Sequence, residues 1–170
     1  TAKDLEGPLK TIYREGEGVL EMVNSLLDVS KLESGTVELS HEKYEMETLL
    51  YEVSNMVYMN MHNQDLDYRI EIEGGFPSAF FGDRMRVKEI FQNLLGNAIK
   101  YTESGTITLS LGGEREENRY KIRLSVQDTG VGMDETDAEQ ILQRFKRTKN
   151  ARTEKVFGAG LGLNITMSLV

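Results

Sequence analysis

The sequence predicts an α+β protein, in which helices cover one face of a mixed β-sheet and one long helix comes first. Residues 84–101 form the clearest helix, because apolar side chains recur there every three or four positions. Residues 106–111 and 120–126 alternate apolar and polar side chains, which is typical of half-buried strands. Helices and strands do not alternate regularly, which favours a two-layer α/β sandwich over a doubly wound sheet.

The first predicted element is a helix over residues 9–33, whose apolar side chains form one stripe. Ser34-Gly35 is expected to end it. The stripe fits either an ordinary core-facing helix or one helix of a bundle, and its place before the first strand favours the bundle. A short strand is expected at Thr36–Leu39, followed by a helix over residues 45–61.

The next strands are predicted at Tyr68–Ile72 and Ala79–Phe81. Asp83 is expected to cap helix 84–101, since its carboxylate can accept hydrogen bonds from free N–H groups. The strands 106–111 and 120–126 are expected to form a hairpin with a long loop at 112–119.

The C-terminal part begins with residues 134–157, which are polar, basic and weakly periodic, and which therefore indicate a loop. A last helix is expected from about Gly160 to Val170.

The composition indicates a protein with a hydrophobic core and an acidic surface. The 170 residues are 39% hydrophobic and 28% charged, so the chain is not compositionally disordered. A net charge of −8 argues against a nucleic-acid partner, which would require a basic face. Cysteine is absent, so disulfides and thiolate metal sites are excluded. No apolar run approaches the roughly 18 residues that span a bilayer. We expect a cytoplasmic location, and this expectation is compatible with a parent protein that is anchored in a membrane.

The predicted helix 84–101 carries a polar stripe beside its apolar one, formed by Glu89, Asn93, Asn97 and Lys100. Amide oxygens are hard ligands that suit Mg²⁺, and a lysine one turn further can neutralise phosphate. The alternative is a solvated helix face. Asparagine is a mediocre helix former, so two of them four residues apart in mid-helix favour a functional role.

Asp128 stands where the second strand of the hairpin ends, just before Gly130 and Gly132. A carboxylate at this point can accept a hydrogen bond from an exocyclic amine such as that of adenine. The two glycines allow the backbone to turn sharply and to approach a flat base. An ordinary strand-end turn is the alternative interpretation.

The last predicted helix starts in a glycine-rich segment that contains Gly158, Gly160, Leu161 and Gly162. The segment lacks the third glycine of a dinucleotide fingerprint and the lysine of a Walker A loop. A glycine cluster at a helix N-terminus favours phosphate, whereas a flexible hinge is the alternative. Basic side chains precede it in an otherwise acidic chain: Lys146, Arg147, Lys149, Arg152 and Lys155.

In this order, the three segments resemble the catalytic ATP-binding domain of bacterial sensor histidine kinases. The resemblance covers residues 36–170 and implies the Bergerat-type α/β sandwich, with residues 134–157 as an ATP lid. Residues 1–35 are similar to the second helix and linker of the family's dimerisation and phosphotransfer hairpin. The matching segments are Asn93–Thr102 (N box), Asp128–Met133 (G1 box), Phe145–Arg147 (F box) and Gly158–Leu163 (G2 box).

The resemblance also implies roles for single residues. Asn97 would hold Mg²⁺, Asn93 would support the metal and the phosphates, and Lys100 and Tyr101 would contact phosphate and ribose. Asp128 would bind adenine in a pocket shaped by Gly130 and Gly132. Phe145 would anchor the lid and Arg147 would approach the terminal phosphate. The phosphate cradle would consist of Gly158, Gly160, Leu161 and Gly162.

One position separates two enzyme classes. In related gyrase, chaperone and mismatch-repair ATPases, a water-activating glutamate stands four residues before the metal-binding asparagine. Here that position is Asn93, whose amide is not a useful base. The resemblance therefore implies a kinase that keeps the γ-phosphoryl group for another acceptor, with Asn93, Lys100 and Arg147 as catalytic residues.

The family's phosphoacceptor histidine has no match here. His41 and His62 are the only histidines, and both are expected to be surface residues. We therefore expect a fragment that lacks the final strands and phosphorylates a histidine on a separate hairpin. A response regulator receiver domain is the indirect partner, and residues 9–33 could form a homodimer. The alternatives are an anti-sigma-type serine kinase, a non-catalytic nucleotide-binding or dimerisation module, and an ATPase.

Overall fold

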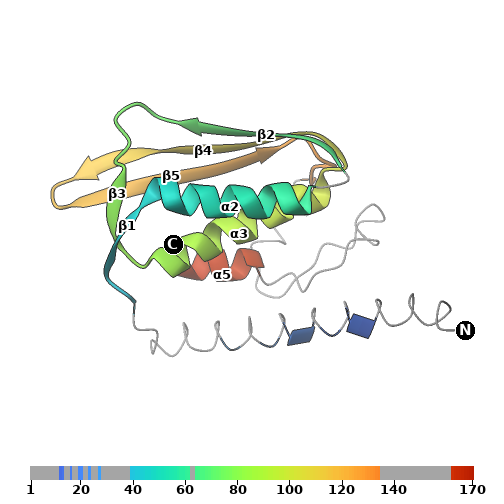
Figure 1. Cartoon of the computed structure of the whole chain (residues 1–170), viewed down its shortest axis with the longest axis horizontal. Coiled ribbons are helices and arrows are strands. Elements are labelled where there is room, and N and C mark those ends of the chain that lie inside the picture. Colours follow the sequence, from blue (N-terminus) through green and yellow to red (C-terminus); the bar gives the residue numbers. More distant parts are fainter. Residues whose placement is uncertain are drawn as a thin grey trace, which may run out of the picture.

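The computed structural model describes residues 39–61, 64–134 and 162–170, together with scattered helical positions between residues 12 and 27. Its main part is a two-layer sandwich, with a β-sheet on one side and helices on the other (Figure 1). The helices are α2 (Met46–Asn60), α3 (Arg84–Tyr101) and α5 (Gly162–Leu169). The predicted α+β sandwich is therefore confirmed.

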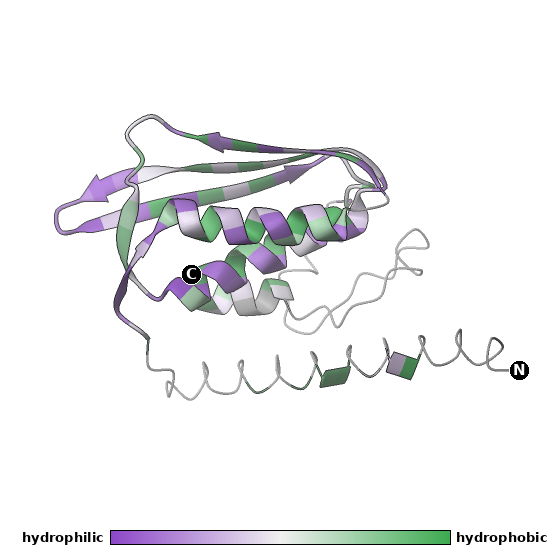
Figure 2. Cartoon of the chain, in the orientation of Figure 1, coloured by the Kyte–Doolittle hydropathy of each residue, from purple (hydrophilic) through white to green (hydrophobic). Residues whose placement is uncertain are grey.

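The main sheet has three strands in the order β2 (Asp65–Ile72), β4 (Ser104–Glu116) and β5 (Arg119–Asp128). β2 runs parallel to β4, and β4 runs antiparallel to β5, so the sheet is mixed. A separate antiparallel pair is formed by β1 (Glu42–Glu45) and β3 (Ala79–Gly82). Figure 2 shows apolar and polar residues alternating along the long strands, as a sheet with one covered face requires.

The hydrophobic core lies between β4 and the helices α2 and α3. Ile107, Leu109 and Leu111 of β4 are fully or almost fully buried, and they alternate with more exposed threonine and serine. Burying a side chain of this size contributes about 1.5–3 kcal/mol. The remaining buried core residues are Tyr44, Met46, Leu49, Leu50, Val53, Val57, Met61, Phe91, Leu95, Ala98 and Ile99.

Helix α3 begins where the sequence predicts, because Asp83 caps it. Asp83 Oδ1 accepts a hydrogen bond from the Arg86 backbone N–H at 3.0 Å, and Oδ2 accepts one from the Ser40 backbone N–H at 3.0 Å. Burial would raise the pKa of Asp83, but these two N–H groups and the Arg86 charge outweigh burial and lower the pKa overall. Asp83 therefore joins the start of α3 to the segment that leads into β1.

The predictions for α2, β2, β3 and α3 are right to within a few residues, but β1 was not predicted. The strand expected at Thr36–Leu39 is wrong for Leu39, which lies in no strand, and residues 36–38 lie outside the described residues. β1 forms because Glu42–Glu45 can pair with β3 and bury Tyr44. A short strand is stable only where such a partner exists, and the sequence of residues 42–45 carries no information about that partner.

The long loop predicted at 112–119 is also wrong. Strands β4 and β5 stay paired up to Glu116 and Arg119, and the turn consists of Glu117 and Asn118, with Glu117 at φ +44°. The polar ribbon is held by its ladder and by Tyr120, whose ring meets Phe76 and Phe80 edge-on at 5.7 and 5.6 Å. The polar residues 112–116 thus form a strand because β5 pairs with them, which their sequence alone does not indicate.

The described positions of the N-terminal helix are exposed, among them Ile12, Val19, Leu20 and Val23. This exposure does not fit a helix that packs on the sandwich core. The boundary between residues 1–35 and 36–170 stays a prediction, as does the loop at 134–157, of which only Asp134 is described. No helix within the described part of the chain has both the length and the apolar character needed to cross a membrane.

A cluster of charged side chains connects α2 to α3. The Glu52 carboxylate accepts hydrogen bonds from Lys88 Nζ at 2.7 Å and from the Arg84 guanidinium. The hydrogen bond from Lys88, together with that from Arg84, lowers the pKa of Glu52 below its usual value of 4.5, although desolvation opposes this shift. The charged form of Glu52 is therefore favoured in the folded protein.

We predict that Glu52→Gln destabilises the protein near neutral pH and that the effect disappears in acid. A carboxyl with a lowered folded-state pKa stabilises the fold above its unfolded pKa, and this contribution is lost as pH falls through the folded pKa. The difference in Tm between wild type and variant, followed by circular dichroism, should therefore shrink below about pH 4.5. Glu114→Gln, at an exposed position of β4, is the matched control; a pH-independent difference for Glu52→Gln would contradict the prediction.

Candidate functional site

Helix α3 is the element to which the other candidate segments attach. It contacts α2 and α5 within the helical layer, and β4 and β5 within the sheet. Phe91, Leu95, Ala98 and Ile99 face the core, so the polar stripe that includes Asn93 and Asn97 is turned away from it. Burial of the apolar stripe therefore determines the direction in which the amides point.

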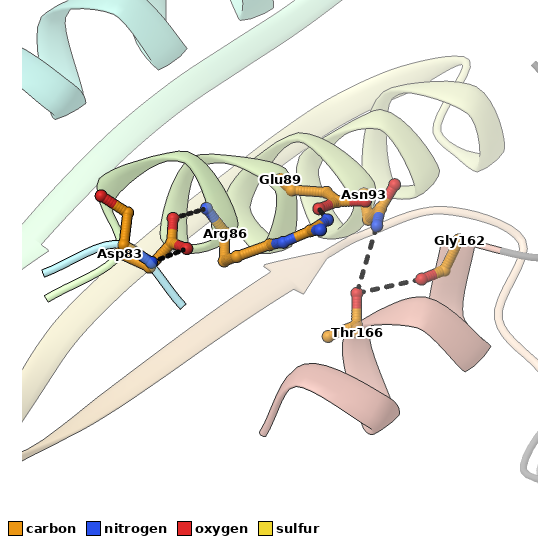
Figure 3. Close-up of polar contacts among 7 residues, drawn as sticks. Asp83, Arg86, Glu89, Asn93, Gly162 and Thr166 are labelled. Carbon is orange, nitrogen blue, oxygen red and sulfur yellow. Dashed lines mark hydrogen bonds and ion pairs between the residues drawn. The ribbon is translucent and has the colours of Figure 1, made fainter. Parts of the chain in front are cut away.

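The Asn93 side chain meets the first turns of α5 (Figure 3). Its Nδ2 donates a long hydrogen bond of 3.5 Å to Thr166 Oγ1, and Thr166 Oγ1 donates to the Gly162 carbonyl at 3.0 Å. A Cβ added to Gly162 would lie 3.1 Å from Asn93 Oδ1. The helix that carries the two asparagines and the glycine-opened helix are thus in direct contact.

The turn after β5 attaches to the C-terminal end of α3. Asp128 Oδ1 accepts a hydrogen bond from the Gly130 backbone N–H at 2.9 Å and one from Thr102 Oγ1 at 3.4 Å. The Val131 backbone N–H donates to the Tyr101 carbonyl at 3.1 Å. Asp128 Oδ2 has no hydrogen-bond partner within the described part of the chain, so one carboxylate oxygen is held in place while the other can accept a ligand's donor.

Gly130 is required for this attachment because no side chain fits there. A Cβ at this position would lie 2.2 Å from the Tyr101 carbonyl oxygen and 2.8 Å from both Asp128 Oδ1 and Thr102 Oγ1. Gly132, two residues further on, has φ +65°, in the left-handed region that glycine adopts readily. The two glycines therefore let the chain pass close to α3 and then turn away.

Asn97, Lys100 and Tyr101 continue the polar stripe of α3 toward this turn. Asn97 is half-buried, and its amide forms no hydrogen bond with any residue in the described ranges. Lys100 Nζ lies 5.2 Å from the centre of the Tyr101 ring. Lys100 also borders an open cavity of about 320 Å³ between α2 and α3, whose other lining residues are Asn60, Gln64, Gly96 and Ile99.

Glu89 is the single carboxylate on α3, and it is engaged. Its Oε2 pairs with the Arg86 guanidinium at 2.8 Å, one turn earlier on the same helix (Figure 3). The carboxylate is thus oriented along the helix toward Arg86. It can support the stripe, as expected, and it lies one helical turn further from Asn97 than Asn93 does.

Residues 82–170, more than half of the chain, match the family described as histidine kinase-, DNA gyrase B-, and HSP90-like ATPase. The chain belongs to this family.

Relatives within this ATPase family include sensor kinases. The signal transduction histidine-protein kinase BarA of Escherichia coli (strain K12) is 34% identical over 95% of this chain, and the sensor protein GacS of Pseudomonas syringae pv. syringae is 33% identical over 95%. Both alignments cover 18% of the relative, so the chain spans about a fifth of these curated proteins. The crystal structure of full-length ShkA in complex with AMPPNP has a TM-score of 0.77 and 27% identity, over 98% of this chain and 33% of that chain. The resemblance to histidine kinase ATP-binding domains is thus confirmed.

The predicted site residues fall into two groups in this ATPase-family domain. Those in the described ranges cluster around α3 in two contacts, Asn93 with Gly162 and Tyr101 with the turn that holds Asp128 and Gly130. The others lie outside the described residues: Phe145, Arg147, Gly158, Gly160 and Leu161. The roles assigned to both groups stay predictions.

His41 does not take part in these contacts. His41 is exposed, as expected; its Nδ1 lies 3.0 Å from the Leu39 carbonyl oxygen, and its ring lies 6.2 Å from that of Phe81. His62 lies outside the described residues.

Two threonines at the site were missed as functional candidates. Thr102 is buried and bonds to Asp128, and Thr166 is buried and bonds to Asn93. Thr166 stands one helical turn after Gly162, and this spacing within the glycine-opened helix was the signal available in the sequence. Buried polar side chains are uncommon and generally have a partner, but burial cannot be seen in a sequence.

The donor set fits a hard divalent cation that is bound together with phosphate. Asn93 and Asn97 provide amide oxygens one turn apart on α3, and Mg²⁺ takes oxygen ligands and keeps several waters. Within the described ranges no three His, Cys, Asp or Glu side chains form a metal-binding group, so a carboxylate-rich cage is not available there. An ion held here by amides would depend on substrate phosphates for further ligands.

We predict that Gly130→Ala and Gly96→Ala change stability in opposite directions. The first adds a methyl group against the Tyr101 carbonyl and should cost about 1–3 kcal/mol. The second adds one in mid-helix with nothing within 4 Å, and should stabilise the protein by up to about 1 kcal/mol. Urea unfolding measures both. Equal stability of Gly130→Ala and wild type would show that the turn does not pack on α3 as described.

Proposed function

We propose that this chain binds Mg·ATP and transfers its γ-phosphoryl group to a histidine outside the chain, as the ATP-binding unit of a protein-histidine kinase. The observation that carries the proposal is the chemistry of α3. It presents the Asn93 amide to the first turn of α5, while its single carboxylate is paired with Arg86. A site with amides in these positions can hold a metal and phosphates, and Asn93 stands where a water-activating glutamate would be needed.

The nucleobase would bind at the turn after β5. Asp128 Oδ2 would accept a hydrogen bond from the exocyclic amine of adenine, while Thr102 and Gly130 hold Oδ1. Gly132 leaves room for a flat ring beside the backbone, since nothing lies within 4 Å of the position that a Cβ would occupy there. The adjacent Tyr101 and Lys100 would meet the ribose and the phosphates, since the Lys100 ammonium lies beside the Tyr101 ring.

The triphosphate would lie between α3 and α5. N–H groups at the start of a helix favour phosphate, and α5 meets α3 at Gly162 and Asn93. Asn97 and Asn93 would hold Mg²⁺, which neutralises charge on the phosphates. Phe145 as lid anchor, Arg147 at the terminal phosphate, and a phosphate cradle that includes Gly158, Gly160 and Leu161 rest on the family resemblance alone.

In the reaction, an imidazole nitrogen of the acceptor histidine would attack the γ-phosphorus. The bond from this phosphorus to the bridging β–γ oxygen breaks, an N–P bond forms, and ADP leaves with the electron pair of the broken bond. Catalysis would consist of positioning and charge neutralisation by Asn93, Lys100 and Arg147. Glu89, one turn further from Asn97 than Asn93 and paired with Arg86, would have a supporting role.

The proposed partners follow from this chemistry. The acceptor histidine would belong to a phosphotransfer hairpin of the parent kinase, and the phosphoryl group would pass on to a response regulator receiver domain. Residues 9–33 would take part in a homodimer, a proposal supported by exposed apolar side chains at helical positions such as Val19, Leu20 and Val23. The similarity to ShkA, a protein solved with AMPPNP, supports the nucleotide site.

We predict that Asp128→Asn weakens ATP binding by about 10- to 100-fold, because a hydrogen bond to a charged acceptor contributes about 1.5–3 kcal/mol. Isothermal titration calorimetry with Mg²⁺ and AMPPNP measures the affinity without turnover. Asp65→Asn, which alters an exposed aspartate of β2, should bind like wild type. Undiminished affinity of Asp128→Asn would place the nucleobase elsewhere.

We predict that the chain, given Mg²⁺ and γ-labelled ATP, phosphorylates a histidine-bearing hairpin taken from its own parent protein. The product should be acid-labile phosphohistidine, and Asn97→Ala should abolish its formation while Thr108→Val, on the other face of the sheet, should not. Steady release of inorganic phosphate without hairpin labelling would instead identify an ATPase. Acid-stable label would indicate a serine kinase.

A further inference from the structure

Thr166 is a buried polar residue that none of the proposed roles uses. It is 7% exposed, and Thr102 is the other buried polar side chain in the described ranges. Thr166 lies on α5 where this helix packs on α3, and its partner Asn93 is 73 residues away in the sequence. Burying a hydroxyl costs free energy unless it is hydrogen-bonded, so the partners of the Thr166 hydroxyl are significant.

The two contacts of this hydroxyl determine its direction. Thr166 Oγ1 donates its one proton to the Gly162 carbonyl at 3.0 Å. Having used that proton, the hydroxyl can only accept from Asn93, at 3.5 Å. The Asn93 amide must therefore turn its NH₂ group toward Thr166, because its carbonyl oxygen would meet a lone pair there.

The opposite end of the amide is thereby directed to the start of α5. The Asn93 oxygen is the atom nearest to the position that a Gly162 Cβ would occupy, at 3.1 Å, so it borders the first turn of α5 (Figure 3). This is the atom that a hard cation or its water ligands would require. An amide turned by 180° would offer N–H donors instead.

We propose that Thr166 is a positioning residue that fixes the orientation of the Asn93 amide, with its oxygen toward the metal and phosphate side of the site. This inference rests on the proposed function. Thr166 itself touches neither nucleotide nor metal, and it acts by presenting a lone pair to Asn93. Its contribution should appear only where Mg²⁺ and nucleotide bind together.

The test replaces the hydroxyl while its shape is kept. Thr166→Val removes both hydrogen bonds, Thr166→Ser keeps them, and Thr108→Val is the matched control on β4. The affinity for AMPPNP is measured by calorimetry with Mg²⁺ and again with EDTA. We expect Thr166→Val to weaken binding about five-fold with Mg²⁺, as for the loss of one ordinary hydrogen bond, and less than about two-fold with EDTA. Thr166→Ser and Thr108→Val should stay within about two-fold of wild type in both conditions.

A second background tests the route through Asn93. In Asn93→Ala, the further change Thr166→Val should have no effect on the Mg²⁺-dependent part of the affinity. Should Thr166→Val not fold, Thr166→Cys is used instead, since a thiol is only a weak donor and acceptor. The same Mg²⁺-dependent loss is expected for it.

Other outcomes overturn the inference in distinguishable ways. Equal weakening with Mg²⁺ and with EDTA, or an unchanged affinity of Thr166→Val, would leave Thr166 as a packing residue while the proposed function stands. An additive effect in the Asn93→Ala background would exclude the route through this amide. If the wild-type chain binds no AMPPNP in either condition, the proposed function fails, and this inference fails with it.

Discussion

Burial of the apolar stripe of α3 is the constraint on which the rest of this domain depends. Phe91, Leu95, Ala98 and Ile99 are held against the sheet and α2, and a helix can satisfy this contact in only one rotation. That rotation carries Asn93 and Asn97 away from this core, and it brings Asn93 against α5. The core therefore does more than stabilise the fold, because it sets the direction of the candidate ligands.

The other candidate segments approach α3 closely at glycines, with no room for a Cβ at Gly130 and little at Gly162. The turn after β5 approaches so closely that the Tyr101 carbonyl meets Gly130, and α5 approaches so closely that the Asn93 amide meets Gly162. Glycine suits these positions because a side chain would collide with, or crowd, its neighbours on α3. Helix α3 thus contacts the Asp128 turn at its C-terminal end and the start of α5 near its middle, an arrangement that supports the proposed nucleotide site.

The sequence was informative wherever one element is sufficient to set a residue's environment. The period of residues 84–101 predicts both the helix and the stripe that contains Asn93 and Asn97, and Asp83 predicts where it starts. Prediction from the sequence failed for strands whose existence or length depends on a partner strand. Strand β1 exists because β3 pairs with it, and the polar ribbon of β4 and β5 extends because each strand supplies the other's hydrogen bonds.

The sequence alone determined the helical and strand periods, the acidic balance of charge, and the order of an amide-bearing helix, a strand-end aspartate and a glycine-opened helix. These properties are local, because they depend on residues close together in the chain. Only the tertiary structure decided that Thr166 accepts from Asn93 and that Thr102 holds Asp128. Such contacts depend on how elements pack in space and on which rotamer each side chain adopts, and residue spacing along the chain does not specify either.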